Sequence, residues 1–290
     1  MFSKKGRLLL LVVLFLILSV YNLMPDEPVI APPGQPPEAG EMRVHFIDVG
    51  QGDSILVELP GGEYMLIDGG TRKAGSLVRD YIKAFGIERL DYVVATHPHE
   101  DHIGGLIEVL EAIPYDNIYM PRVAHTSKTF ETMVETVTDK GKRFKRARAG
   151  VVITEGEGLK VDILAPVGDG YDNLNNYSAV VKVEYRNVGV IFMGDAEALS
   201  EREIDGTRAK AQVLKVGHHG SRSSTSLEFL EKVSPIYAVI SCGEGNDYGH
   251  PHPETLKALE DAGINILRTD LSGTIVLTTD GNRIVFTSDY

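Results

Sequence analysis

Three histidines and one aspartate lie together in a short segment of this sequence. His97, His99, Asp101 and His102 directly follow the apolar run 92–95, in the pattern His-x-His-x-Asp-His. Imidazole nitrogens and carboxylate oxygens are ligands that zinc and similar divalent ions prefer. In an extended segment His97 and His99 point to the same side, whereas Asp101 and His102 can begin a helix and face a second ion. The segment therefore predicts part of a two-metal site, in preference to a surface loop that is rich in histidine by chance.

The segments around these residues alternate between strands and helices from Glu41 onward. Short apolar and β-branched runs predict strands at 44–47, 54–59, 64–67 and 92–95, with a Pro-Gly-Gly turn at 60–62. Apolar residues at helical spacing predict helices at 77–85, 103–110 and 128–140, and Pro253 predicts another that stops at Gly263. Thr225 and Glu228 have the spacing of a capping box, which predicts a helix from there through Lys232.

A weak internal repeat relates two parts of the chain. One predicted hairpin ends in Asp68, and a similar one ends in Asp195. Each hairpin precedes a helix and then a strand that ends in histidine, at His97 and at His218. Two β-rich halves of this kind would pack sheet against sheet with helices outside, and their matching strand ends would surround one cleft.

The repeat assigns a role to several residues. Asp195 follows a strand end, where a carboxylate can bridge two metal ions. His218 aligns with His97, so we predict that His218 is a ligand and that its neighbour His219 supports the site or faces the substrate. Asp68 is predicted to hold a ligand by a hydrogen bond, since metal sites depend on such supports.

The composition limits the remaining possibilities. The chain has 290 residues, of which 43% are hydrophobic, enough for one large domain or two packed halves. A net charge of −12 argues against nucleic-acid binding over the whole surface, although a local basic patch can still bind a polyanion. The single cysteine, Cys242, excludes an internal disulfide and a cysteine-based zinc site.

The N-terminal residues predict export or membrane anchoring. Basic residues precede an apolar stretch at 8–20, and the apolar character continues to residue 24. Because no A-x-A cleavage site follows, we favour an uncleaved signal anchor at 1–24 over a cleaved signal peptide. A proline-rich linker at 25–40 then leads to a globular domain at 41–290. This domain would lie outside the cell membrane on its anchor, or be secreted if the N-terminal segment is cleaved.

Several strings resemble a known family. They lie at 45–54, 66–70, 193–197, 214–221 and 248–251, and they read HFIDVGQGDS, LIDGG, MGDAE, LKVGHHGS and YGHP. With the His-x-His-x-Asp-His segment, they make residues 41–290 resemble the metallo-β-lactamase fold superfamily of hydrolases. The resemblance is strongest to the extracellular hydrolase domain of ComEC-type competence proteins and its free-standing relatives. It implies a four-layer αββα sandwich of the α/β (α+β) class, with two divalent metal ions, usually zinc and sometimes manganese, at one edge.

The chain departs from this family in two respects. Many superfamily members carry a further metal-binding histidine before the bridging aspartate, where this chain has only His125. We expect Asn176, or a water molecule that it holds, to take that place and to leave the ion at His97 and His99 more open and weaker. ComEC-type transporters also carry many membrane spans, whereas this chain has at most one, so we do not expect it to form a DNA channel.

The resemblance implies hydrolysis at the metal ions. Two divalent ions held by Asp101 and Asp195 would lower the pKa of a bridging water and polarise a phosphoryl or carbonyl oxygen. His219 and His250 are candidates to stabilise the oxyanion or to protonate the leaving group, although a histidine beside a proline also suits a simple turn. The resemblance places Asp53, in a glycine-rich turn, near the metals, and turn chemistry alone is the alternative.

A basic segment bears on the substrate. Six cations lie in residues 140–148, among them Lys142, Arg143, Lys145 and Arg146, and such a run suits DNA or another phosphate-rich polymer. The alternative is a solvated helix end and strand edge. We therefore predict an extracytoplasmic phosphodiesterase, either a nuclease related to DNA uptake or a hydrolase of teichoic-acid or phosphocholine-type diesters. A non-catalytic surface binding module stabilised by metal remains an alternative, and the sequence indicates no protein partner.

Overall fold

The computed structural model describes residues 40–289 of the chain. The predicted signal anchor (1–24), and the linker (25–40) apart from its last residue, lie outside this range. Among the helices of residues 40–289, none combines the length and the apolar character needed to cross a membrane.

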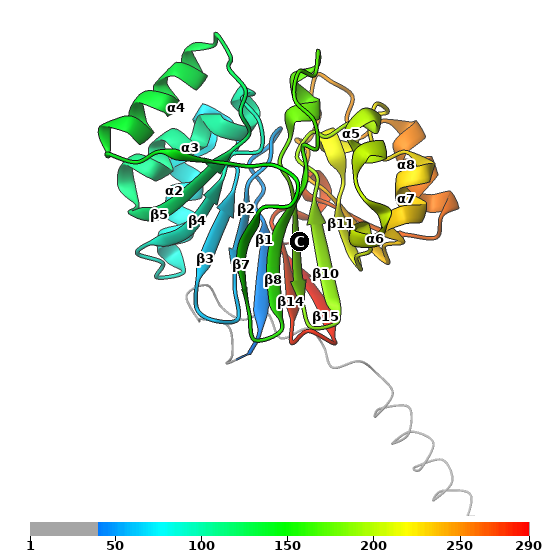
Figure 1. Cartoon of the computed structure of the whole chain (residues 1–290). Helices are drawn as coiled ribbons and strands as arrows, with labels where there is room; N and C mark the ends of the chain where they lie inside the picture. The colour runs from blue at the N-terminus through cyan, green and yellow to red at the C-terminus, as the bar shows by residue number, and fades with distance from the viewer. Residues whose placement is uncertain (1–39, 290) are drawn as a thin grey trace, which may run out of the picture. The chain divides into compact units, whose positions relative to one another are not determined.

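The described residues form two mixed β-sheets (Figure 1). The first sheet has the strand order β15-β14-β1-β2-β3-β4-β5-β6. Its strands are β1 (Met42–Phe46), β2 (Ile55–Glu58), β3 (Tyr64–Ile67), β4 (Leu90–Val94), β5 (Tyr115–Met120), β6 (Phe144–Arg146), β14 (Ile275–Thr279) and β15 (Ile284–Ser288). The second sheet has the order β13-β12-β11-β10-β9-β8-β7. Its strands are β7 (Val152–Gly156), β8 (Leu159–Ala165), β9 (Val180–Tyr185), β10 (Val188–Phe192), β11 (Val213–Lys215), β12 (Tyr237–Ile240) and β13 (Asn265–Arg268).

Helices flank the pair of sheets on both sides (Figure 1). Beside the first sheet lie η1 (Arg72–Ala74), α2 (Gly75–Ala84), α3 (Glu100–Ala112) and α4 (Lys128–Asp139). Beside the second sheet lie α5 (Ala198–Glu203), α6 (Gly206–Ala209), α7 (Leu227–Val233) and α8 (Pro253–Asp261). The short turns η2 (Leu174–Tyr177) and η3 (Gly217–Gly220) and the short helix α9 (Thr269–Ser272) lie in the connections.

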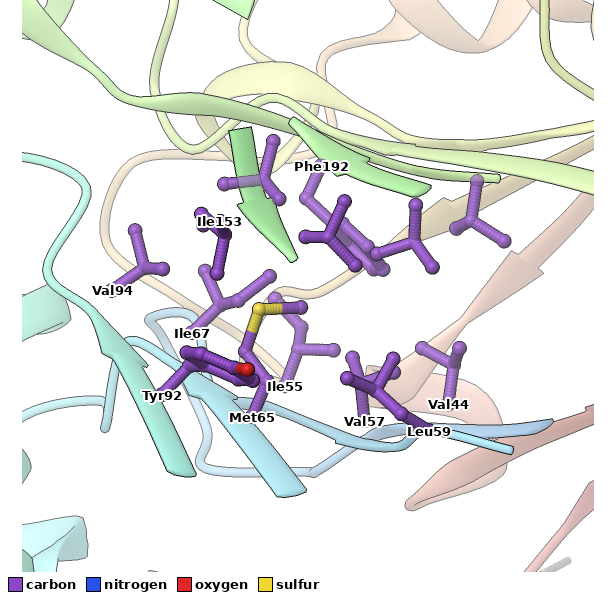
Figure 2. Packing of buried hydrophobic residues seen from close by; sticks show 14 of the residues in the cluster. Val44, Ile55, Val57, Leu59, Met65, Ile67, Tyr92, Val94, Ile153 and Phe192 are labelled. Carbon is purple, nitrogen blue, oxygen red and sulfur yellow. The ribbon is translucent and has the colours of Figure 1, made fainter. Parts of the chain in front are cut away.

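The main core lies between the two sheets. Figure 2 shows side chains of the first sheet, such as Ile55, Val57 and Met65, on one side of this core and Phe192 of the second sheet on the other. Leu56, between Ile55 and Val57 in the chain, points the opposite way and packs in the cluster under the helices. Because both faces of the strands are covered, they read as continuous apolar runs in the sequence. The predicted four-layer αββα sandwich is confirmed.

The predicted helices are present, but the start of α7 differs from the prediction. Ser226, and not Thr225, is its N-terminal cap, and the Ser226 hydroxyl accepts a hydrogen bond from the backbone N–H of Phe229. The carboxylate of Glu201 accepts from the backbone N–H of Thr225 instead. The capping-box prediction was therefore wrong by one residue, because a side chain distant in sequence satisfies the backbone there.

The internal repeat is reflected in the topology. In one half, β2 and β3 pair antiparallel, and β3 then pairs with β4 in parallel. In the other half, β9 and β10 pair antiparallel, and β10 then pairs with β11 in parallel. The carboxyl ends of parallel strands meet at one edge of a sheet, so each sheet carries polar residues to such an edge.

Candidate metal centre

The His-x-His-x-Asp-His segment links β4 to helix α3. His97 lies in the loop, and His99 is the N-terminal cap of the helix. Asp101 and His102 lie in the first turn, where a carboxylate interacts favourably with the helix dipole. The strand end and the helix start therefore present four side chains to one side of the fold.

Close glycine contacts bring α3 against the loop that follows β3. A Cβ atom on Gly105 would lie 1.9 Å from the carbonyl oxygen of Gly69, and one on Gly69 would lie 2.6 Å from the backbone nitrogen of Leu106. A larger residue at either position would push the helix away from the loop. The contact places Asp68, which has a left-handed φ of 57°, directly behind His102.

The carboxylate of Asp195 lies between two groups of side chains. Its Oδ2 atom is 3.6 Å from Nε2 of His97 and 3.7 Å from Nε2 of His218. Its Oδ1 atom is 3.1 Å from Nε2 of His102 and 3.4 Å from Nε2 of His219. Each oxygen thus faces its own pair of imidazole rings.

Two further predicted ligands lie beside these pairs. Nδ1 of His99 is 2.9 Å from Nε2 of His97, and Oδ2 of Asp101 is 3.4 Å from Nε2 of His219. We call His97, His99 and His218 the first half of the centre. We call Asp101, His102 and His219 the second half. Asp195 is shared by the two.

The buried atoms of the second half fit a divalent cation. Nε2 of His102, Nε2 of His219 and Oδ1 of Asp195 are buried and make no hydrogen bond within residues 40–289. An ion at about 2.0–2.1 Å from tetrahedral ligands would hold those ligands roughly 3.3 Å apart. The two rings lie at 3.1 and 3.4 Å from Oδ1 of Asp195, which agrees with this spacing. A cation between these polar atoms would satisfy them, since they are buried, close together and without hydrogen-bond partners.

The electrostatics of the second half also favour positive charge there. Burial lowers the pKa of His102, but the Asp195 carboxylate above all outweighs it and raises that pKa well above its ordinary value. Burial also lowers the pKa of His219, but the carboxylates of Asp195 and Asp53 outweigh it and raise that pKa to about 10. At neutral pH both rings therefore favour the doubly protonated imidazolium form, unless a metal ion displaces the second proton.

Buried acceptors fix the rings of the second half from behind. Oδ2 of Asp68 is 2.8 Å from Nδ1 of His102, and the Asp68 carboxylate also accepts from the backbone N–H and the hydroxyl of Thr96. The carbonyl oxygen of Ser241 accepts from Nδ1 of His219 at 3.0 Å. With Nδ1 bound in both rings, Nε2 is the free nitrogen that faces the centre.

The first half is more open. The side chain of His218 is 24% exposed, and its Nδ1 lies 3.3 Å from Glu197 Oε1 and 3.3 Å from the hydroxyl of Ser223. His99 is also partly exposed, whereas His97 is fully buried. Burial and the neighbouring ring of His102 hold the pKa of His97 well below its ordinary value, so this ring is neutral and could bind a metal ion.

Both adjacent histidines face Asp195, which differs from the sequence prediction. The prediction made His218 a ligand and placed His219 behind the site or toward the substrate. In the turn η3, both residues adopt a left-handed backbone, with φ of 48° at His218 and 53° at His219. This conformation, between Gly217 and Gly220, directs the two rings to different oxygens of Asp195. An alignment of one strand end with another could not reveal it.

Asn175, and not Asn176, lies beside the first half. Oδ1 of the buried Asn176 accepts a hydrogen bond from the backbone N–H of Ser200 in α5. Nδ2 of Asn175 lies 3.4 Å from Nδ1 of His218, and Asn175 lines the pocket that opens onto the centre. The prediction for Asn176 was therefore wrong by one residue, since consecutive side chains of the 3₁₀ turn η2 point in different directions.

This pocket has a volume of about 410 Å³. Its walls include His125 from the loop before α4, and Tyr248 and His250 from the loop before α8. His250 is mostly buried, its Nδ1 has no hydrogen-bond partner in the described residues, and burial lowers its pKa to about 4. Tyr248, which the prediction did not include, stacks on His250 with ring centroids 5.7 Å apart and is 66% exposed.

Asp53 lies behind the centre and not in the pocket. Its Oδ1 atom is 2.8 Å from Nζ of Lys215 and 3.3 Å from Nδ1 of His219. Burial raises the pKa of Asp53, but Lys215 and His219 outweigh it and lower that pKa to about 2. Lys215 was missed from the sequence. A single lysine in the apolar run 213–216 was the available signal.

The four predicted nucleic-acid contacts lie on and beside the edge strand β6. Nζ of Lys142 is 5.6 Å from the ring centre of Tyr115, and Nζ of Lys145 is 5.5 Å from that of Tyr119. Arg143 is exposed, and Arg146 pairs with Asp169 at 2.7 Å. None of the four lines the pocket. Their role in binding DNA stays a prediction.

The sequence is similar to proteins of bacterial competence and recombination. It is 32% identical over 82% of its length to ComE operon protein 3 of Bacillus subtilis, and 32% identical over 82% to competence protein ComA of Neisseria gonorrhoeae. It is 29% identical over 80% of its length to recombination protein 2 of Haemophilus influenzae. The chain spans about a third of the length of these relatives, covering 33%, 33% and 28% of them in the same order.

Solved structures share the fold. The metallo hydrolase Igni18 of Ignicoccus hospitalis superposes with a TM-score of 0.55 at 20% identity, over 81% of this chain and 98% of Igni18. The diiron β-hydroxylase CmlA of Streptomyces venezuelae superposes with a TM-score of 0.53 at 13% identity, over 82% of this chain and 54% of CmlA. Residues 47–244 match the family described as the Metallo-beta-lactamase superfamily. Together with the αββα sandwich and its clustered histidines and aspartates, this match shows that the chain belongs to the metallo-β-lactamase superfamily of metal-dependent hydrolases.

Proposed function

We propose that this protein is an extracytoplasmic metal-dependent phosphodiesterase. The observation that carries the proposal is the position of Asp195, whose two oxygens each face a separate pair of histidines. Enzymes that cleave phosphodiesters with two metals hold the ions about 3.5–4 Å apart and so stabilise both the attacking and the leaving oxygen. A shared carboxylate with one ligand group at each oxygen suits such a pair of ions.

Zinc is the metal that we favour for both halves. Zinc binds readily to imidazole and carboxylate ligands, and the first half offers three imidazoles. Manganese is the second choice, because it prefers oxygen ligands and the second half combines Asp101 with the shared Asp195.

The residues of the pocket have distinct tasks in this reaction. Bound ions would supply an activated water and a Lewis acid for the phosphoryl group. Burial raises the pKa of Asp195, but His102 and His219 outweigh it and hold that pKa well below its ordinary value. Asp195 therefore stays ionised and can serve both halves of the centre. His250 is neutral at pH 7 and can donate a hydrogen bond from a ring N–H to a phosphoryl or leaving-group oxygen.

Nucleic acid is the substrate that we favour, since two of the relatives are named as a competence protein and a recombination protein. Teichoic-acid or phosphocholine-type diesters are the second candidate. The exposed ring of Tyr248 at the pocket wall favours this candidate, because an aromatic face attracts a quaternary ammonium group.

The proposed place of action rests on the N-terminal residues. We infer that residues 1–24 anchor the protein in the cell membrane, with the hydrolase domain outside. Protease added to intact cells should then remove the domain, and the full-length protein should keep its N-terminus. Recovery of a soluble form that begins after residue 20 would instead indicate a cleaved signal and secretion.

A substrate panel tests the activity. The detergent-solubilised full-length protein, loaded with Zn²⁺ or Mn²⁺, is incubated with single- and double-stranded DNA, RNA, teichoic acid, a phosphocholine diester, a β-lactam and a chromogenic phosphodiester. Two bound ions with phosphodiester turnover, and no turnover by Asp195→Ala, is the expected result. Bound metal without turnover of any diester would contradict the proposal and favour a non-catalytic binding module.

A further inference from the structure

Lys215 forms a buried ion pair that joins the two sheets behind the metal centre. The residue ends β11 of the second sheet, and its side chain is completely buried. Its Nζ atom is 2.8 Å from both carboxylate oxygens of Asp53, which lies in the turn between β1 and β2 of the first sheet. Nζ also donates to the backbone oxygen of Val216 at 2.9 Å. The ammonium group is thus surrounded by three acceptor atoms.

Stability alone does not explain this pair. Two buried charges lose their hydration on folding, and an apolar pair of similar volume is often as stable or more so. The two sheets already share a continuous apolar core between them. An ion pair at this position therefore points to a role in the site beside it.

Asp53 touches the second half of the centre at several points. Its Oδ1 atom lies 3.3 Å from Nδ1 of His219. Its backbone N–H donates to the carbonyl oxygen of Asp101 at 3.2 Å, and its own carbonyl oxygen accepts from the N–H of Gly70 at 2.7 Å. A shift of Asp53 would therefore disturb the ring of His219 and the first turn of α3 together.

The ion pair also bears on which residues bind metal. The carboxylate of Asp53 lies close enough to Asp195 and His219 for the three to hold one ion. Both oxygens of that carboxylate already lie against the ammonium group of Lys215, so a metal ion would have to displace a buried cation. Oδ1 of Asp53 and Oδ1 of Asp195 both lack a hydrogen-bond partner in the described residues, but the printed ion-pair neighbours of Asp195 are histidine rings of the centre and include no lysine or arginine.

We propose that Lys215 is a positioning residue for the second half of the centre. It holds Asp53 against Nδ1 of His219, where Asp53 and the carbonyl oxygen of Ser241 together fix that ring with Nε2 toward the ion, and it keeps Asp53 out of the ligand set. This inference rests on the two-ion site of the proposed function but not on its substrate.

Metal binding by Lys215→Met in the full-length protein tests this inference. Zn²⁺ titration should show that the affinity of one of the two sites falls by roughly 10–100-fold, as when other residues that support metal ligands are removed. The electronic spectrum of the Co²⁺-loaded variant should also change, because Asp53 becomes free to join the ligand set. Lys182→Met is the matched control. Lys182 is also buried and ion-paired, but its partner Glu184 is exposed and belongs to none of the clusters that could hold a metal ion, so replacement of Lys182 should leave both metal readouts unchanged.

Wild-type affinity and an unchanged Co²⁺ spectrum in folded Lys215→Met would overturn the inference. If that variant does not fold, the double variant Asp53→Asn/Lys215→Met removes both buried charges and should fold, yet still bind one ion weakly. Wild-type affinity in the double variant, or failure of both variants to fold, would assign the pair to the fold alone. A protein that binds two ions normally but cleaves no diester would contradict the proposed function and leave this inference standing.

Discussion

The two halves of the metal centre share Asp195 but differ in burial, charge and support. In the second half, both rings are buried and each is bound at Nδ1 by an acceptor behind it. Asp101 adds a second carboxylate to that half. The first half has three histidines, of which His99 and His218 are partly exposed toward the pocket. A site with more negative charge and more rigid ligands binds a cation more tightly, so we expect the second half to hold its ion firmly. We expect the first half, which is more open, to bind its ion more weakly and to leave room for substrate.

Removal of Asp195 should erase the difference between the halves, because this carboxylate serves both. We expect Asp195→Ala to lose both ions and to reduce turnover by more than the roughly 10–100-fold that removal of a supporting residue costs.

His97→Ala should lose the first-half ion and abolish turnover while the second ion remains. Elemental analysis of the metal content, with circular dichroism to confirm the fold, checks both variants. Normal activity in either would show that the centre is misassigned.

The two adjacent histidines separate the halves. His219→Ala removes a ligand from the second half and should leave one weakly bound ion, whereas His218→Ala should leave one tightly bound ion. This expectation replaces the one drawn from the sequence, in which His218 bound metal and His219 supported the site or faced the substrate. Zn²⁺ titration of each variant measures both stoichiometry and affinity. Two ions with wild-type affinities in His219→Ala would restore the original assignment.

The hydrogen-bond partners behind His102 and His218 should differ in how much they contribute to metal affinity. Asp68→Asn weakens the buried hydrogen bond behind His102 and should lower the second-half affinity by roughly 10–100-fold. Glu197→Gln removes a partly exposed partner of His218, and exposed ion pairs contribute little, so first-half affinity should fall less than about fivefold. Zn²⁺ titration of both variants side by side gives the ratio of the two decreases in affinity. Equal decreases would show that burial does not distinguish the two halves.

The sequence predicted the layers of the fold and most of the cluster, for physical reasons that also explain what it missed. Apolar periodicity and the His-x-His-x-Asp-His spacing are local, and they placed β2–β4, α3 and the candidate ligands in 97–102 near their observed positions. Lys215 and Asp53 meet across 162 residues, so local patterns could not show their contact. The choices between Asn175 and Asn176, and between His218 and His219, depended on single-residue backbone geometry in short turns.

The smallest effect on hydrolysis is expected at the basic edge strand, which lies apart from both halves. Strand β6 runs parallel to β5, and β5 runs parallel to β4, so Arg146 lies at the same sheet edge as the centre and Lys142 lies toward the other end. A polyanion bound along β6 would therefore extend toward the sheet edge that carries the pocket. Hydrolysis of a small chromogenic diester should be unchanged when Lys142, Arg143, Lys145 and Arg146 are replaced by Gln, because none of them lines the pocket.

Binding of DNA should change in the same variant. Each DNA phosphate that the variant no longer neutralises should flatten the dependence of log affinity on log salt by roughly one unit. Because Asp169 already neutralises Arg146, we expect a smaller change than the removal of four unpaired cations would give. Neutralisation of Lys73 and Lys83, which are exposed near and on α2, removes two positive charges away from β6 and should leave the slope unchanged, which controls for an effect of net charge alone. An unchanged slope in the β6 variant would show that the run is a solvated strand edge, and would favour a smaller extracytoplasmic phosphodiester, which needs only the open first half and the pocket, as the substrate.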